Sequence, residues 1–187
     1  FNADDVSAET LTVSCTNNGD YDSLQEAVDN VNNGGIINIE KNCYFEENVV
    51  IDKSVYIRGD TNQSTTSSPP VFDGNGTSPI IVVSDNVHIS SISVTGADNI
   101  EAEGDQNKHA GILLNNTHLN SNDDYGVKNI SIHEVLFYDN YLGLYGTYTN
   151  DFRITNCTFI ENELGARLRN TNDNGMYEYS NYGLFRH

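Results

Sequence analysis

Residues 130–144, Ile130-Ser-Ile132-His-Glu-Val135-Leu-Phe137-Tyr-Asp-Asn140-Tyr-Leu142-Gly-Leu144, repeat as Phe152-Arg-Ile154-Thr-Asn-Cys157-Thr-Phe159-Ile-Glu-Asn162-Glu-Leu164-Gly-Ala166. The offset is 22 residues throughout, and apolar residues coincide at seven positions. An earlier copy, Val87-His-Ile89-Ser-Ser-Ile92-Ser-Val94, aligns with residues 130–137 at an offset of 43. That offset fits either two periods or one repeat that insertions have lengthened.

Within each copy the apolar residues alternate, skip, and alternate again. Alternation indicates strands with one buried face, and the skip indicates a turn between two strands. A unit of about 22 residues with three short strands is typical of one coil of a β-solenoid. Asn140 and Asn162 then share a corner in adjacent coils. We predict that they form a structural ladder there, because Asn tolerates a left-handed backbone and stacked amides hydrogen-bond along the axis.

The first coil of a solenoid exposes a strand edge that must be covered. Residues 23–32 predict an amphipathic helix, in which Ser23 is the N-cap and Glu26 completes a capping box. The apolar residues of this helix share one face, which we expect to lie across the first coil.

Five further stretches resemble the start of pectin-lyase-like right-handed β-helix proteins: Tyr21-Asp-Ser-Leu-Gln-Glu-Ala-Val28, Gly34-Gly35-Ile-Ile-Asn-Ile39, Tyr44-Phe-Glu-Glu-Asn-Val-Val-Ile51, Lys53-Ser-Val-Tyr-Ile-Arg-Gly59 and Val71-Phe-Asp-Gly-Asn-Gly76. Ile154-Thr-Asn-Cys-Thr-Phe159 is similar to the repeat of that superfamily, which includes archaeal adhesin-like surface proteins and periplasmic NosD-like proteins. The resemblance covers roughly residues 20–170. It implies a fold but no single chemistry, since lyases, hydrolases, adhesins and virus spikes share that fold.

The predicted fold class is therefore all-β: a right-handed parallel β-helix of about 22 residues per coil with an N-terminal amphipathic α-helix cap. Residues 21–170 form the capped β-helix. Residues 1–20 are an N-terminal extension suited to strand exchange, and residues 171–187 are an aromatic, Asn-rich C-terminal segment.

The charge of the chain is strongly acidic, with 27 Asp and Glu against 9 Lys and Arg and a formal net charge of −18. Such a surface repels phosphates, so nucleic acid is excluded as a partner. No apolar run is long enough to cross a bilayer, so membrane insertion is excluded as well. The chain begins at Phe1 without a leader, as a mature exported protein would, although an arbitrary boundary would look the same.

Cysteines and sequons favour the outside of a cell. Cys15 and Cys43 flank the helical segment, and a disulfide between them would usefully close a loop of that size. Cys157 lies in an alternating strand and is interpreted as a small buried hydrophobe. Candidate glycosylation sites are Asn62, Asn75, Asn115, Asn129 and Asn156. We expect an extracellular or cell-surface location.

Two insertions interrupt the repeat and carry carboxylates around residues 110–114. The candidate ligands for Ca²⁺ are Asp98, Glu101, Glu103, Asp105, Asp123 and Asp124. No EF-hand spacing is present, and a solvated acidic loop is the alternative interpretation. We expect no cofactor to be required.

Catalytic residues are not indicated. A lyase on this fold needs a carboxylate-bound Ca²⁺ and a basic residue on one face, and a hydrolase needs two carboxylates at a defined separation. Arg153 and His133 fall on outward positions without a matching carboxylate ladder. Only four or five coils fit after the cap, which is short for a sugar-binding groove.

The chain ends suggest assembly instead. Leu11 and Val13 alternate like a strand without an obvious mate, which a neighbouring subunit could accept. The C-terminal apolar residues either fold back over the last coil or dock on another subunit; they are Met176, Tyr177, Tyr179, Tyr182, Leu184 and Phe185. We predict an extracellular structural or adhesive protein, a subunit of a surface filament built by head-to-tail contacts with itself. The alternative is a polysaccharide-active lyase or hydrolase, or a glycan-binding module.

Overall fold

The computed structural model describes residues 8–60, 68–98, 110–114, 126–147, 149–169, 176–179 and 183–184. The strands form three six-stranded sheets. Sheet A contains β1 (Thr10–Val13), β2 (Gly35–Ile39), β5 (Val55–Gly59), β8 (Val87–Ser90), β11 (Lys128–His133) and β14 (Asn150–Thr155). Sheet B contains β3 (Tyr44–Glu46), β6 (Val71–Asp73), β9 (Ser93–Thr95), β12 (Leu136–Tyr138), β15 (Thr158–Ile160) and β18 (Gly183–Leu184). Sheet C contains β4 (Val49–Ile51), β7 (Ile80–Val82), β10 (Ala110–Leu114), β13 (Leu142–Thr147), β16 (Leu164–Arg169) and β17 (Met176–Tyr179).

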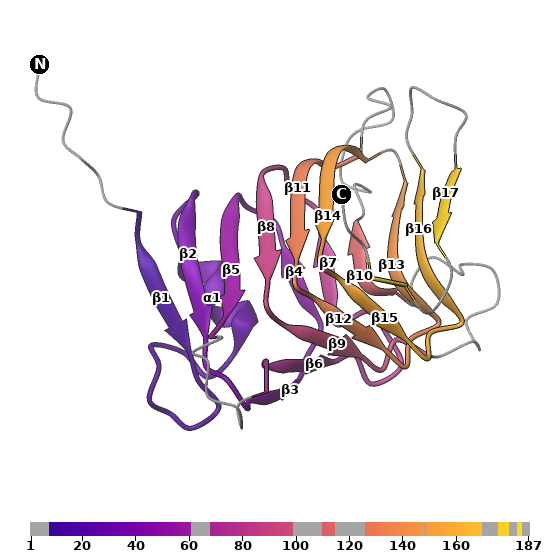
Figure 1. Cartoon of the computed structure of the whole chain (residues 1–187). Coiled ribbons are helices and arrows are strands. Elements are labelled where there is room, and N and C mark those ends of the chain that lie inside the picture. The colour runs from indigo at the N-terminus through magenta and orange to yellow at the C-terminus, as the bar shows by residue number, and fades with distance from the viewer. Residues whose placement is uncertain are drawn as a thin grey trace, which may run out of the picture.

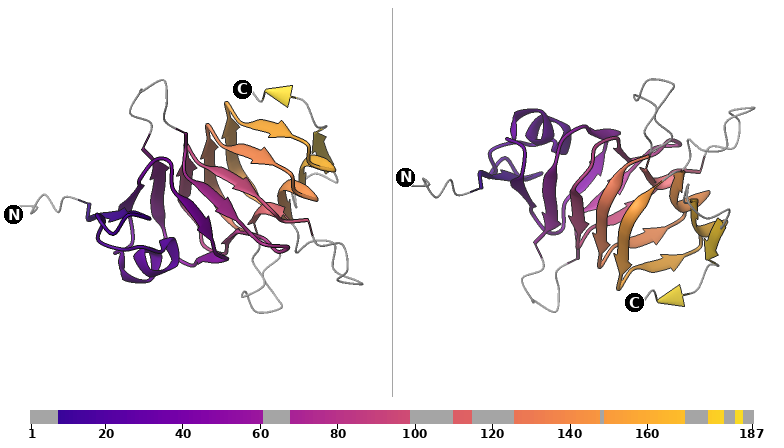
Figure 2. Two further views of the ribbon diagram at one scale, coloured as in Figure 1. Left: turned by 90° about the horizontal axis from the view of Figure 1, so that it is seen from below. Right: turned by 90° about the horizontal axis from the view of Figure 1, so that it is seen from above.

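The chain visits the three sheets in turn, so each circuit is one coil of a parallel β-helix. From β2 to β16 every strand pairs in parallel with the equivalent strand of the next coil. The coils stack along one axis, with the N-terminal strand at one end and β16 and β17 at the other (Figures 1 and 2).

The 22-residue repeat corresponds to one coil. Ile130 pairs with Phe152, and Leu142 pairs with Leu164. The earlier offset of 43 also spans a single coil, because Ile89 pairs directly with Ile132. The second interpretation of that offset, one coil lengthened by insertions, is therefore correct. Residues 99–109 and 115–125 account for the extra length in the sequence.

The core fills the inside of the coils with aliphatic side chains and stacked aromatic rings. Phe45 stacks on Phe72 with ring centroids 5.0 Å apart, and Phe137 stacks on Phe159 at 4.6 Å. Both pairs join adjacent coils, so the inner wall of sheet B is continuous from coil to coil.

Cys157 lies in this core, fully buried, and its Sγ faces the carbonyl oxygens of Ile132 and Thr155. Burial raises the pKa of the Cys157 thiol to about 11, so almost no thiolate forms at mildly alkaline pH. We expect iodoacetamide to leave Cys157 unmodified in native protein and to alkylate it once denaturant is added, as intact-mass spectrometry would show. Labelling in native buffer at the rate of an exposed thiol would contradict this environment.

The predicted asparagine ladder is present. Asn140 Nδ2 donates to Asn162 Oδ1 at 2.9 Å, and both side chains are buried. One part of the prediction was wrong: the left-handed residue at this corner is the preceding one, Asp139 or Glu161, with φ of 53° and 55°. The chain makes its sharp bend one residue earlier, which turns the following Asn inward.

Helix α1 (Leu24–Asn30) covers the N-terminal end and buries Leu24, Ala27 and Val28. Ser23 is the N-cap, and its side chain accepts from Glu26 N at 3.4 Å. Glu47, from the first coil, accepts from Ser23 Oγ and Leu24 N. The end of the helix is therefore attached to the strand layer that it covers. Among the described residues, no helix is long and apolar enough to cross a membrane.

The N-terminal strand has a partner in its own chain. β1 pairs in parallel with β2, and Val13 is buried in the core while Leu11 packs against it. The expectation that this strand lacks a mate was wrong, because its partner, Gly35–Ile39, lies beyond the helix in sequence. Part of the core would have to leave its place before β1 could be given to another subunit.

The C-terminal segment adds the last strands of two sheets. β17 pairs antiparallel with β16, and β18 pairs antiparallel with β15. Of the two predicted alternatives, these backbone strands follow the first, folding back over the last coil. Tyr182 and Phe185 lie outside the described residues.

Candidate functional site

The outer face of sheet A combines arginine, histidine and an exposed tyrosine on neighbouring strands. Strand alternation and register place two rows of outward side chains across all six strands. One row is Thr10, Ile36, Tyr56, His88, Ser131 and Arg153. The other is Thr12, Asn38, Arg58, Ser90, His133 and Thr155.

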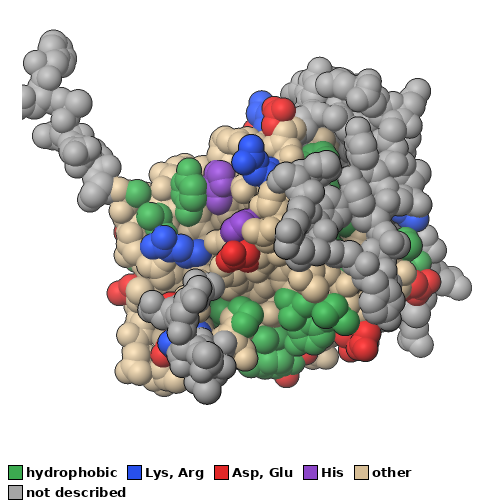
Figure 3. Space-filling model, viewed as in Figure 1, with side chains coloured by type: hydrophobic (Ala, Val, Ile, Leu, Met, Phe, Trp, Pro, Cys, Tyr) green, Lys and Arg blue, Asp and Glu red, His purple; other side chains and the backbone are tan. Residues whose placement is uncertain are grey.

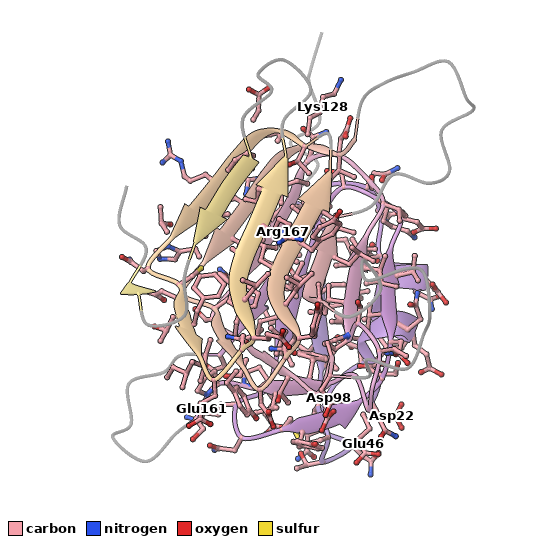
Figure 4. The ribbon with its side chains drawn as sticks, turned by 90° about the vertical axis from the view of Figure 1, so that its right-hand side faces the viewer. Asp22, Glu46, Asp98, Lys128, Glu161 and Arg167 are labelled. Carbon is pink, nitrogen blue, oxygen red and sulfur yellow. A yellow bond between two sulfur atoms is a disulfide. The ribbon has the colours of Figure 1, made fainter. Side chains whose placement is uncertain are left out.

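These twelve positions include no carboxylate, although the chain has 27 acidic residues. Histidine and basic side chains lie on this face, and an acidic side chain borders one of the histidines (Figure 3). Glu134, which follows β11, lies beside the second row, with its Oε1 3.4 Å from His133 Nε2. In the view along the axis, the labelled acidic residues Asp22, Glu46, Asp98 and Glu161 lie on the lower rim, beside sheet B (Figure 4). Sheet A therefore gives this acidic protein a face that an anion can approach.

An aromatic pair lies in the middle of this face. The rings of Tyr56 and His88 stack with centroids 4.3 Å apart and an interplanar angle of 2°. Tyr56 is 46% exposed, and partial burial lowers the pKa of His88. The pair thus places an exposed aromatic side chain and an imidazole with hydrogen-bonding capacity side by side on this face.

Arg58 lies beside this pair, and a neighbour fixes its orientation. Arg58 Nε donates to Asn38 Oδ1 at 2.6 Å, across adjacent coils. One edge of the guanidinium is thereby held to the sheet, and the planar group is preorganised for a ligand.

A pocket of about 670 Å³ opens where β1, β2 and β5 end. It is lined by Thr12, Val13, Ser14, Asn18, Gly19, Asn38, Ile39, Glu40, Arg58, Gly59 and Asp60. Glu40 accepts hydrogen bonds from Ser14 Oγ and, at 3.0 Å, from Thr16 Oγ1. Asp60 N donates to Ile39 O, so Asp60 lies beside Glu40 on the next coil. The pocket combines carboxylate acceptors with guanidinium and amide donors, and its volume suits a small ring.

The loop of residues 14–21 forms one wall of this pocket. Asp20 accepts from Thr12 N and Thr12 Oγ1, both at 2.8 Å, and these bonds hold the pKa of Asp20 below its usual value. Gly19 passes so close to β1 that an added Cβ would lie 2.9 Å from Thr12 O. A disulfide joins Cys15, in this loop, to Cys43 in the first coil.

No family model matches the chain, and no curated protein matches it. A solved structure, pectin methylesterase from carrot, is similar over 87% of this chain and 50% of its own, with a TM-score of 0.52 and 13% identity. The chain is a right-handed parallel β-helix, a fold that it shares with this enzyme. The predicted fold class is thus confirmed. The β-helix spans about half the length of that enzyme, and at this identity the likeness is one of fold.

Most of the predicted metal ligands fall outside the described residues: Glu101, Glu103, Asp105, Asp123 and Asp124. Asp98 is described and exposed. Within the described ranges, the one group of three close ligand atoms is Cys15, Glu40 and Cys43, and the disulfide already uses both sulfurs. Calcium binding therefore stays a prediction.

Three of the predicted glycosylation sites, Asn75, Asn129 and Asn156, are exposed and have a left-handed backbone; Asn129 lies near the start of β11. Asn129 Nδ2 also donates to Asn86 Oδ1 at 2.7 Å. Asn62 and Asn115 lie outside the described residues. Glycosylation of these asparagines stays a prediction.

Sequence reasoning placed Arg153 and His133 outward correctly but missed the pocket and the Tyr56–His88 pair. The alternation in residues 36–39 and 55–59 indicates which side chains point outward. The alternation does not indicate which strand of the next coil each strand pairs with. That pairing places the residues of the site side by side.

Proposed function

We propose that this protein is an extracellular adhesive module that binds an acidic polysaccharide on the outer face of sheet A. The observation that carries the proposal is the exposed Tyr56–His88 pair, in a face whose twelve strand positions lack carboxylates. Exposed aromatic rings pack against the C–H faces of sugar rings. Arg58 and Arg153, three coils apart on this face, supply cations for acidic groups along the polymer.

The carrot enzyme supports the choice of polymer in one respect: its name describes action on pectin, and its fold is shared. Pectin after removal of its methyl esters is an acidic polymer, so polygalacturonate is a suitable first probe. We expect the contacts of Arg58 and Arg153 with the polymer to weaken as salt is added, because salt screens the attraction between exposed charges. Salt also screens the repulsion between the polymer and the net charge of −18, so the effect of the two arginines is read by comparing wild type with an Arg58→Gln variant.

Tyr56→Ala tests the proposal directly. We expect its affinity for polygalacturonate, measured by isothermal titration calorimetry, to fall about tenfold, since the exposed ring is the main apolar contact on this face. Tyr44→Ala is the matched control, because Tyr44 is similarly exposed, at 52%, but lies on sheet B. Equal affinity of wild type and Tyr56→Ala would place the binding surface elsewhere.

A polysaccharide hydrolase is the second candidate, because Glu40 and Asp60 line one pocket and such enzymes use two carboxylates. Release of reducing sugars in the binding mixture, lost in Asp60→Asn, would favour it over a purely adhesive module.

The head-to-tail filament predicted from the sequence remains part of the proposal but needs a route other than donation of β1, whose partner is β2. Negative-stain electron microscopy with and without a calcium chelator tests both the filament and the predicted metal.

A further inference from the structure

The binding face of sheet A is closed at one end. The row that forms the pocket floor, Thr12, Asn38 and Arg58, continues over later coils through Ser90, His133 and Thr155. On the opposite side, Asn18 and Gly19 line the pocket together with Arg58 and Gly59, two strands away. A polymer that follows this row toward the N-terminal end therefore meets the loop of residues 14–21.

This wall is held at several points. Asp20 N and Tyr21 N both donate to Thr12 O, at 2.9 and 3.1 Å, and Ser14 N donates to Tyr21 O at 3.0 Å. Residues 20–21 thus lie along the outer edge of β1. The disulfide from Cys15 to Cys43 fixes the beginning of the loop to the first coil. Moving the wall aside would break these hydrogen bonds together. The free energy this requires keeps a polymer from passing the wall.

The charges in the pocket differ from those on the rest of the face. Glu40 and Asp60 both lie in the closed end, whereas the side chains of the rows leading to it are cationic, neutral or aromatic and the carboxylate of Glu134 beside them is paired with His133. A carboxylate repels the acid groups of the polymer, that of a terminal sugar included, but accepts a hydrogen bond from a hydroxyl. Arg58 lines the same pocket and offers a cationic partner for the acid group of a terminal sugar. The terminal sugar has one more hydroxyl than an interior sugar, which uses that oxygen in a glycosidic bond.

We propose that the pocket binds the terminal residue of the polysaccharide, with Glu40 accepting from its extra hydroxyl, so that the protein recognises chain ends. This inference rests on the proposed function and specifies its ligand. Ser14 and Thr16 fix the Glu40 carboxylate in place, and a site built to bond a hydroxyl discriminates strongly against a ligand that lacks it.

Stoichiometry tests the inference. Wild-type protein is titrated with short and long size-fractionated polygalacturonate, and bound protein per chain is measured by calorimetry and by sedimentation. End recognition predicts the same number of proteins per chain for both fractions. A number that grows with chain length would overturn end recognition and leave the proposed function standing. No binding to either fraction would overturn both.

A blocked terminus identifies the contact. Oligogalacturonates are prepared with the reducing-end or the non-reducing-end hydroxyl methylated, and we expect one of the two blocks to reduce the affinity of wild type at least about tenfold. Glu40→Gln should bind the unblocked oligomer about as weakly as wild type binds the blocked one. The same block should not change the affinity of this variant. Glu163→Gln, an exposed residue elsewhere, is the control and should behave as wild type. If neither block changes wild-type affinity, the pocket does not hold a terminus.

Discussion

Replacing both Cys15 and Cys43 with serine is expected to lower the free energy of unfolding by about 3–4 kcal/mol, because the disulfide closes a loop with a sequence separation of 28. For a chain of this size the melting temperature should fall by about 10 °C. The loop enclosed by the disulfide contains α1, so the bond restricts the part of the unfolded chain that must return to cover the first coil.

The loss of stability should appear first in the N-terminal coils, because each solenoid coil contacts only its neighbours. Hydrogen exchange should accelerate at the amides of β1 and β2, and those of β14 to β16 should exchange as in wild type. The wall of the pocket would loosen in the same variant, since Cys15 lies within it.

A reducing agent supplies the matched control. A dithiol reductant should lower the melting temperature of wild type toward that of the double-serine variant and leave the variant unchanged. If wild type melts at the same temperature with and without the reductant, while free-thiol counting shows the bond to be open, the disulfide contributes no stability.

The fold could be predicted from the sequence because the last coils are nearly uninterrupted. From Ile130 to Ala166 the same side chains recur at the same corners, and the period is the coil length. The Asn140–Asn162 ladder is the clearest case, since identical residues at a constant offset must stack if the coils do.

The site could not be predicted because the first coils differ in length. Asn38 contacts Arg58 at a separation of 20 residues, and Ser54 contacts Asn86 at a separation of 32. No single period aligns Ile36, Tyr56 and His88, so their common row is invisible until the pairing of the strands is known. The pocket wall is a loop without any repeat, and its position depends on the hydrogen bonds of Asp20 with β1.

Asn140→Ala is expected to cost about 3–5 kcal/mol of folding free energy, a large effect for a side chain that bears no charge. Asn140 is 3% exposed. Its Oδ1 accepts from Ala97 N at 3.2 Å. Its Nδ2 donates to Val94 O at 3.2 Å, to Tyr138 O at 2.9 Å and to Asn162 Oδ1 at 2.9 Å. Alanine would leave Ala97 N without this acceptor, remove the side-chain donor to Val94 O and Tyr138 O, and open a cavity at the corner. Asn162 Oδ1 would keep only its hydrogen bond from the backbone N of residue 140.

The comparison with Asn140→Asp separates hydrogen bonding from volume. Aspartate has nearly the same shape, but an oxygen would replace Nδ2 against three oxygen acceptors, so we expect a loss at least as large as that of alanine. Asn33→Ala, at an exposed position, is the control and should change stability by no more than about 0.5 kcal/mol. Urea denaturation followed by circular dichroism measures all three. A loss for Asn140→Asp well below that for alanine would mean that Asn140 stabilises the corner by filling space and that its donated hydrogen bonds are secondary.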